Sequence, residues 1–192
     1  MRRLSQLYWA LDETTSTNAK IEALACYFAE APPEDAIWAV AMLRGERPRR
    51  PAKTTDLRVW AAELAGIPLW LMEQCYTTVG DLAETLNLVV PAPETSTDDT
   101  SLRVWCEERI PSLRSMDEST QRATVCAWWS ALAARERFVL NKLVTGGLRV
   151  GVSKGLVERA LAKHAGIPRD TITHRLMGAW PKTADFYKTL IA

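Results

Sequence analysis

A short segment near residue 150 carries the residue types that could bind a phosphate group. Gly146 and Gly147 are expected to end the helix before them, because only glycine takes left-handed backbone angles without penalty. Ser153 is a favourable N-cap for the helix that follows. Between the two helices, free amides near a helix N-terminus, together with Arg149 and Lys154, predict a phosphate-binding site.

Helices must position this segment, because apolar residues recur at helical spacing along most of the chain. The helices are expected at about 3–12, 19–30, 33–43, 54–65, 69–79, 82–89, 101–110, 117–134, 135–145, 153–165, 168–178 and 182–191. No segment shows sustained strand alternation, so the predicted fold class is all-α. The stretch 91–100 is rich in proline, threonine and acid and has no periodicity, which predicts a mobile acidic linker.

The sequence also contains an internal repeat with an offset of one hundred residues. Ala-Gly-Ile-Pro at 65–68 recurs as Ala-Gly-Ile-Pro at 165–168, and Arg49 aligns with Arg149. The repeat predicts two pseudo-symmetric helical lobes at about 15–86 and about 115–190. Their equivalent loops, 47–50 and 146–154, could contact the backbone of a duplex without reading its base sequence.

The charge distribution favours such a partner more than the total charge does. The formal net charge is only +1, but residues 42–58 hold six Lys/Arg against two acids, and residues 135–163 hold seven against two. Residues 84–118 hold eight acids against three bases. Two basic segments and one acidic segment are the asymmetry expected of a surface that meets phosphates.

Other features exclude several classes of protein. The four cysteines form no C-x-x-C pair and the two histidines have no partner at ligand spacing, so reduced thiols and no metal site are expected. No apolar run could span a bilayer and no signal peptide is evident, which predicts a cytoplasmic protein without a membrane partner.

With these residues in view, the chain resembles the N-terminal DNA-binding domain of bacterial ATP-dependent DNA ligases. The resemblance is carried by residues 14–20 (TTSTNAK), 80–85 (GDLAET), 141–153 and 174–180 (HRLMGAW). It implies one all-α domain over 1–192 that engages the minor groove on both sides of a nick. It also implies that Leu148, Arg149, Gly151 and Ser153 line a DNA-facing loop, and that Thr15, Thr17 and Asn18 bind phosphate.

The full set of candidate DNA-binding residues combines the loops, the family motifs and their neighbours. It comprises Thr15, Ser16, Thr17, Asn18, Lys20, Arg47, Arg49, Arg50, Lys142, Gly146, Gly147, Leu148, Arg149, Gly151, Val152, Ser153 and Lys154. No catalytic residue is expected among them.

One departure from the family concerns the chemistry. Ligases attach AMP to the lysine of a K-x-D-G motif, and none of the seven lysines here begins that motif. The chain is therefore expected to be part of a longer ligase, whose nucleotidyltransferase and OB domains would use ATP and magnesium. DNA repair, replication and recombination are the processes that such an enzyme would serve.

Two kinds of partner remain open at this point. The resemblance implies nicked duplex DNA and the catalytic domains of the parent ligase, with this chain as a monomer. The alternative is a helical protein-interaction module whose basic loops dock an acidic partner. A sequence-specific helix-turn-helix regulator is disfavoured, because no helix has one face rich in Arg, Asn and Gln.

Overall fold

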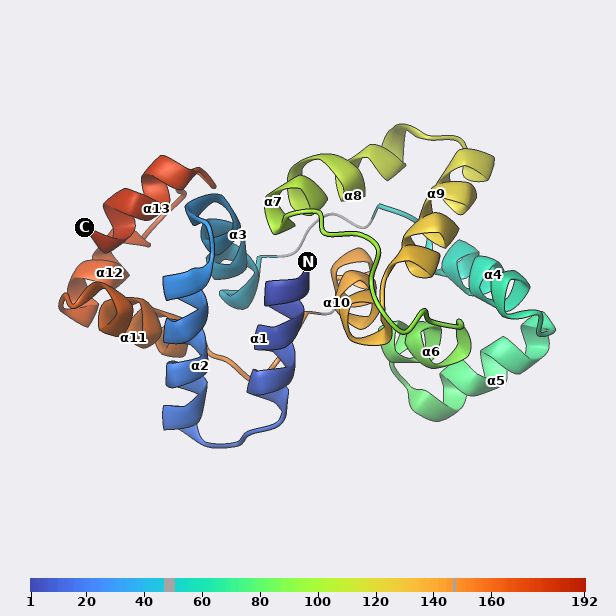
Figure 1. Ribbon diagram of the computed structural model, residues 1–192, viewed down its shortest axis with the longest axis horizontal. Helices are drawn as coiled ribbons and strands as arrows, with labels where there is room; N and C mark the ends of the chain where they lie inside the picture. The colour runs from blue at the N-terminus through green and yellow to red at the C-terminus, as the bar shows by residue number, and fades with distance from the viewer. Residues whose placement is uncertain (47–50, 147) are drawn as a thin grey trace. The chain divides into compact units, whose positions relative to one another are not determined.

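The computed structural model describes residues 1–46, 51–146 and 148–192, and these ranges contain helices and no β-strand (Figure 1). The predicted all-α fold class is therefore confirmed. The described residues form two compact units. We call residues 2–46, 101–103 and 148–192 the terminal unit, and Met1 with the described residues of 51–100 and 104–146 the central unit.

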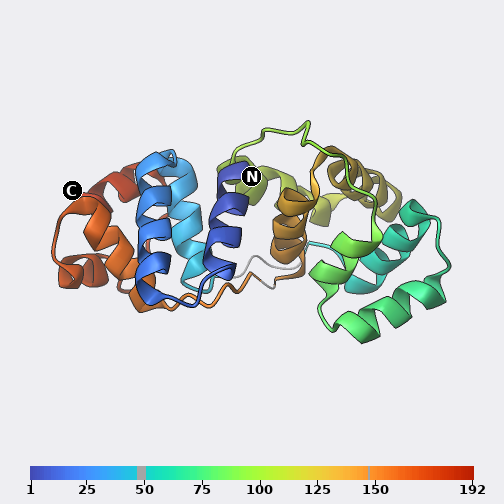
Figure 2. The same ribbon diagram turned by 60° about the horizontal axis from the view of Figure 1, so that its bottom comes forward.

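The terminal unit joins the first and last helices of the chain. Figures 1 and 2 both show the blue α2 beside the orange α11, and α3 likewise packs on α13. Leu24, Ile37 and Leu161 are completely buried in its interior. Its main helices are α1 (Arg2–Asp12), α2 (Thr17–Glu30), α3 (Pro33–Leu43), α11 (Lys154–Ala165), α12 (Arg169–Arg175) and α13 (Ala184–Ile191).

The central unit pairs helices in a similar way. Here α4 packs on α9 and α6 packs on α10, with α5 against α4 and α6. Trp60, Met72 and Trp129 are almost fully buried in this second core. The main helices are α4 (Thr54–Ala65), α5 (Leu69–Val79), α6 (Leu82–Val89), α9 (Glu118–Ala131) and α10 (Ala134–Thr145).

The segment 102–115 is a succession of short helical pieces rather than the single helix expected at 101–110. Its pieces are α7 (Leu102–Val104), a π-helix (Trp105–Arg109), α8 (Ile110–Ser112) and a 3-10 turn (Leu113–Ser115). The amide of Ile110 donates to the carbonyl oxygen of Trp105, five residues earlier. Pro111 has no amide to donate, so the regular α-helical pattern cannot continue through it.

The internal repeat is distributed between the two units in a crossed manner. The first copy supplies α2–α3 to the terminal unit and α4–α6 to the central unit, while the second supplies α9–α10 to the central unit and α11–α13 to the terminal unit. The pairings correspond, since α2 with α11 is equivalent to α9 with α4, and α3 with α13 to α10 with α6. The compact units therefore do not coincide with the lobes at about 15–86 and 115–190.

The repeated tetrapeptide has a clear structural reason. Gly66 and Gly166 end α4 and α11 with left-handed φ angles of 66° and 69°. The isoleucine after each glycine donates its amide back into the helix, over 3.0 Å in the first copy and 3.2 Å in the second. The proline that comes next is the N-cap of α5 or of α12. The tetrapeptide thus ends one helix and begins the next.

The acidic segment 91–100 has no regular secondary structure but makes fixed contacts. The amide of Thr97 donates to Ala131 at 2.9 Å, and the Ser96 hydroxyl accepts from the amide of Ala133 at 2.8 Å. Within this predicted mobile linker, Asp98 forms an ion pair with Arg109 and its side chain is largely buried. These contacts attach the segment to the junction of α9 and α10 and to the π-helix.

No helix in the described ranges is long and apolar enough to cross a bilayer.

Candidate nucleic-acid interface

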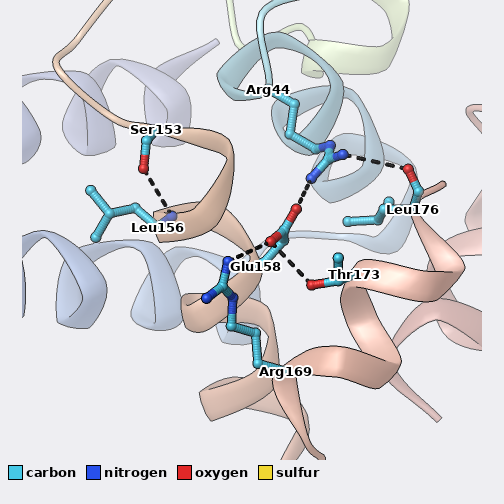
Figure 3. Close-up of polar contacts among 7 residues, drawn as sticks. All are labelled: Arg44, Ser153, Leu156, Glu158, Arg169, Thr173 and Leu176. Carbon is cyan, nitrogen blue, oxygen red and sulfur yellow. Dashed lines mark hydrogen bonds and ion pairs between the residues drawn. The ribbon is translucent and has the colours of Figure 1, made fainter.

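We call the connection between α10 and α11 the glycine loop. It ends α10 and begins α11 as predicted. Gly146 ends α10 with a φ of 76°, which requires a residue without a Cβ penalty. In the terminal unit, the Ser153 hydroxyl oxygen accepts the amide of Leu156 at 3.2 Å and caps α11 (Figure 3). Residues 148–153 between them have no regular secondary structure.

Lys20 holds this loop against α2. Its ammonium Nζ donates to the carbonyl oxygen of Gly151 at 3.0 Å and to that of Val150 at 3.4 Å. Gly151 has a φ of 61°, and a Cβ added there would lie 3.0 Å from the same Nζ. Glycine at 151 is therefore favoured by its backbone conformation, and a side chain there would make the flexible end of Lys20 shift.

The direction of these carbonyl groups fixes the direction of the amides beside them. In a trans peptide the C=O and N–H groups point in opposite directions, and no described peptide bond is cis. Because the carbonyl oxygens of Val150 and Gly151 point toward Lys20, the amides of Gly151 and Val152 point away from it. Within the described ranges, neither of these two amides has a hydrogen-bond partner.

The row of unpaired amides continues into α11. The amides of Ser153, Lys154 and Gly155 also lack a partner among the residues that the structure describes, because a helix cannot satisfy its own first amides. Successive free amides at a helix N-terminus attract an anion through hydrogen bonds and through the helix dipole. The described structure thus leaves the five consecutive amides of residues 151–155 without a partner, as a backbone phosphate site requires.

Two cations adjoin this row. Arg149 and Lys154 are exposed, and neither side chain makes an ion pair or a hydrogen bond with any other described residue. Their charges are therefore available to a partner. The side chains of Leu148 and Val152 are half-exposed on the same loop and offer apolar contact.

The start of α2 offers a second helix N-terminus in the same unit, joined to the loop through Lys20. The hydroxyl oxygen of Thr14 accepts the amide of Ser16 at 3.1 Å, and that of Ser16 accepts the amide of Ala19 at 3.3 Å. The amides of Thr17 and Asn18 have no partner in the described part of the chain. The side chains of Thr15, Thr17 and Asn18 are exposed there, as an anion site needs.

Lys142 differs from the other candidates. It lies in the central unit, where its side chain is largely buried and its Nζ forms an ion pair with Asp81 at 2.7 Å. The ammonium also lies 5.1 Å from the centre of the Phe138 ring. Burial would raise the pKa of Asp81, but hydrogen bonds from Lys142 and from backbone amides lower it overall. Lys142 therefore stabilises the junction of α10 and α6 and presents no free charge.

Arg47, Arg49, Arg50 and Gly147 lie outside the described residues. Elsewhere the basic segments hold less free charge than their composition indicates. Arg58 pairs with Glu73, and Lys163 pairs with Glu22. Arg137 is buried, and its guanidinium donates hydrogen bonds to α6 and to the residues after it.

A buried cluster of charged and polar side chains, which was not predicted from the sequence, connects α11 with its neighbouring helices. Glu158, one turn into α11, accepts hydrogen bonds from Arg44 at 2.5 Å, from Arg169 at 3.1 Å and from Thr173 at 3.1 Å (Figure 3). Arg44 also donates to the carbonyl oxygen of Leu176 at 3.4 Å. One carboxylate thereby connects α11 with the end of α3 and with α12. The only hint in the sequence was a carboxylate next to Val157, inside an apolar stripe.

Comparison with known proteins identifies the family. The model of the family described as DNA ligase N terminus matches residues 1–162. The chain therefore belongs to this family, the N-terminal domain of ATP-dependent DNA ligases. The match includes α2, the glycine loop and most of α11, so both elements of the candidate interface lie within it. A search of curated proteins found no match.

Proposed function

We propose that this chain binds duplex DNA through its phosphate backbone, as the DNA-binding domain of an ATP-dependent DNA ligase. The observation that carries the proposal is the row of unpaired amides at residues 151–155, with the unpaired Arg149 and Lys154 beside it. Backbone amides and exposed cations recognise phosphate irrespective of base sequence. Leu148 would then meet the sugar edges of the minor groove.

The finer parts of the proposal follow from the family. Nicked duplex is the substrate of a ligase, so we expect the domain to hold DNA at a nick for sealing during repair, replication or recombination. Adenylation, with ATP and magnesium, would belong to other domains of the parent enzyme, because no lysine here begins a K-x-D-G motif.

Fluorescence anisotropy with labelled duplexes tests the proposal. The protein is titrated against two intact duplexes of unrelated sequence and one nicked duplex, each at several salt concentrations. We expect similar affinities for the two sequences and a steep loss of affinity with salt, since each neutralised phosphate contributes about −0.9 to the slope of log K against log salt. Absence of binding at low salt would reject the proposal and favour an acidic protein as the partner.

A pair of arginine variants localises the contact. Arg149→Ala should weaken binding by roughly tenfold on every sequence and reduce the salt slope by about one. Arg159→Ala is the matched control, because Arg159 is an exposed arginine on α11 that lies outside the loop. Equal effects of the two substitutions would show that the loop is not the contact.

A further inference from the structure

Lys20 belongs to the stretch Thr14–Lys20, in which the sequence predicts phosphate contacts, yet its ammonium is directed at protein. It donates to the carbonyl oxygens of Gly151 and Val150 at 3.0 Å and 3.4 Å, and its side chain is half-buried. No carboxylate in the described ranges pairs with it. A lysine that meets only carbonyl oxygens serves to orient the peptide groups that carry them.

We propose that Lys20 is a positioning residue of the interface, which turns the amides of Gly151 and Val152 outward for phosphate and does not itself contact DNA. The proposal rests on the proposed function. Its basis is the peptide geometry: fixing two consecutive carbonyl groups on the α2 side fixes the two following amides on the opposite side. Without the ammonium, these carbonyl oxygens would lose their only hydrogen-bond donor in the described structure.

The arrangement also explains why the loop depends on α2. Residues 148–153 have no regular secondary structure of their own, so local hydrogen bonding cannot hold them in one conformation. Lys20 is in the second turn of α2, a helix that packs along α11. The loop is thereby attached to a rigid element, and the free amides of Thr17 and Asn18 keep a constant relation to those of Gly151 and Val152.

A positioning role and a direct contact make different predictions for salt dependence. Lys20→Met retains most of the aliphatic side chain and removes the charge. We expect it to weaken duplex binding by about tenfold, through loss of two oriented amides, and to leave the slope of log K against log salt close to that of the parent. Lys154→Met, which removes an exposed cation next to the same amides, should instead reduce the slope by about 0.9.

The free protein provides a second measurement that does not depend on DNA. In the nuclear magnetic resonance spectrum, Lys20→Met should shift the amide resonances of Gly151 and Val152 and leave that of Gly166 in place. Lys20→Arg, which can also donate to two carbonyl oxygens, should restore both the resonances and the affinity.

The possible outcomes separate the two proposals. If Lys20→Met reduced the salt slope as Lys154→Met does and left the loop resonances unchanged, Lys20 would be a direct phosphate contact and the positioning role would be wrong. If the parent bound no duplex, the proposed function would fail, and unshifted loop resonances in Lys20→Met would then reject the positioning role independently.

Discussion

The carboxylate of Glu158 accepts a hydrogen bond from Arg44 at 2.5 Å, and this contact joins the middle of α11 to the residue that ends α3 (Figure 3). The second carboxylate oxygen takes Arg169 and Thr173 from α12. Only 8% of the Glu158 side chain is exposed. The glycine loop begins α11 one turn earlier, so this cluster keeps the helix that supports the loop in a fixed place.

Replacing Glu158 with glutamine should test how much the cluster contributes to folding. Glu158→Gln leaves Arg44 beside a neutral group in a mostly buried site, so we expect a loss of about 2 kcal/mol in the free energy of unfolding, measured with urea. Glu22→Gln is the matched control, because Glu22 pairs with Lys163 on the surface. This substitution should cost less than about 0.5 kcal/mol. Comparable small losses from both would show that burial does not strengthen the Glu158 cluster.

The same carboxylate should make stability depend on pH in the acid range. Burial would raise the pKa of Glu158, but hydrogen bonds from Arg44, Arg169 and Thr173 lower it below its ordinary value of 4.5. A carboxylate with a lowered folded-state pKa stabilises the protein at pH values above its unfolded-state pKa. This contribution is lost as the pH falls through the folded-state pKa.

Thermal unfolding between neutral pH and about pH 3 measures this effect. The parent should be more stable than Glu158→Gln at neutral pH, and the difference should shrink once the pH falls below 4.5. Asp81 and Asp98, whose pKa values are also lowered, should produce the same acid loss in both proteins. A difference that stays constant down to the lowest pH would exclude Glu158 as its source.

Most of the fold could be predicted from the sequence, because helices depend on local signals. Periodic apolar residues, Ser16 and Ser153 as N-caps, and Gly66, Gly146 and Gly166 as terminators all act within a few residues of one another. The crossed division of the repeat between the units was not predictable in this way. It depends on which helices pair across the chain, and a repeat specifies equivalent pairings without saying which copy supplies each partner.

The candidate site was predictable to a smaller extent. The loop, its capping serine and its two exposed cations followed from residue type and spacing. The orientation of Lys20 did not, because a lysine in a phosphate-binding motif and a lysine that donates to carbonyl oxygens are identical in sequence. The ion pair of Lys142 was not predictable either, because only the folded structure brings Asp81 to it across 61 positions.

Trp70 shows how the two copies of the repeat differ. Trp60 and Trp129 are buried in the core, yet Trp70 in the first turn of α5 is 66% exposed. The equivalent position in α12 is Asp170, in the first turn. A negative charge there interacts favourably with the helix dipole. Trp70→Asp should therefore change the free energy of unfolding by less than about 1 kcal/mol, with a stabilising sign.

Urea unfolding of a buried counterpart gives the comparison. Trp60→Leu removes part of a side chain that is only 2% exposed, and it should cost at least about 2 kcal/mol. A similarly large loss from Trp70→Asp would mean that the exposed indole contributes to the folded core.

Gly151 offers the sharpest test of the loop, because its replacement has two separable effects. Gly151→Ala forces a side chain into a left-handed conformation and places a Cβ 3.0 Å from the Lys20 ammonium. Gly166→Ala has the same backbone penalty at a φ of 69°, but its Cβ would meet no atom within 4 Å. Both should lose about 1 kcal/mol of stability through the backbone.

Only Gly151→Ala should also displace Lys20, so only this variant should weaken duplex binding in fluorescence anisotropy. If Gly166→Ala reduced the affinity as much as Gly151→Ala, the loss would reflect general destabilisation, and the contact between Lys20 and the loop would not control binding.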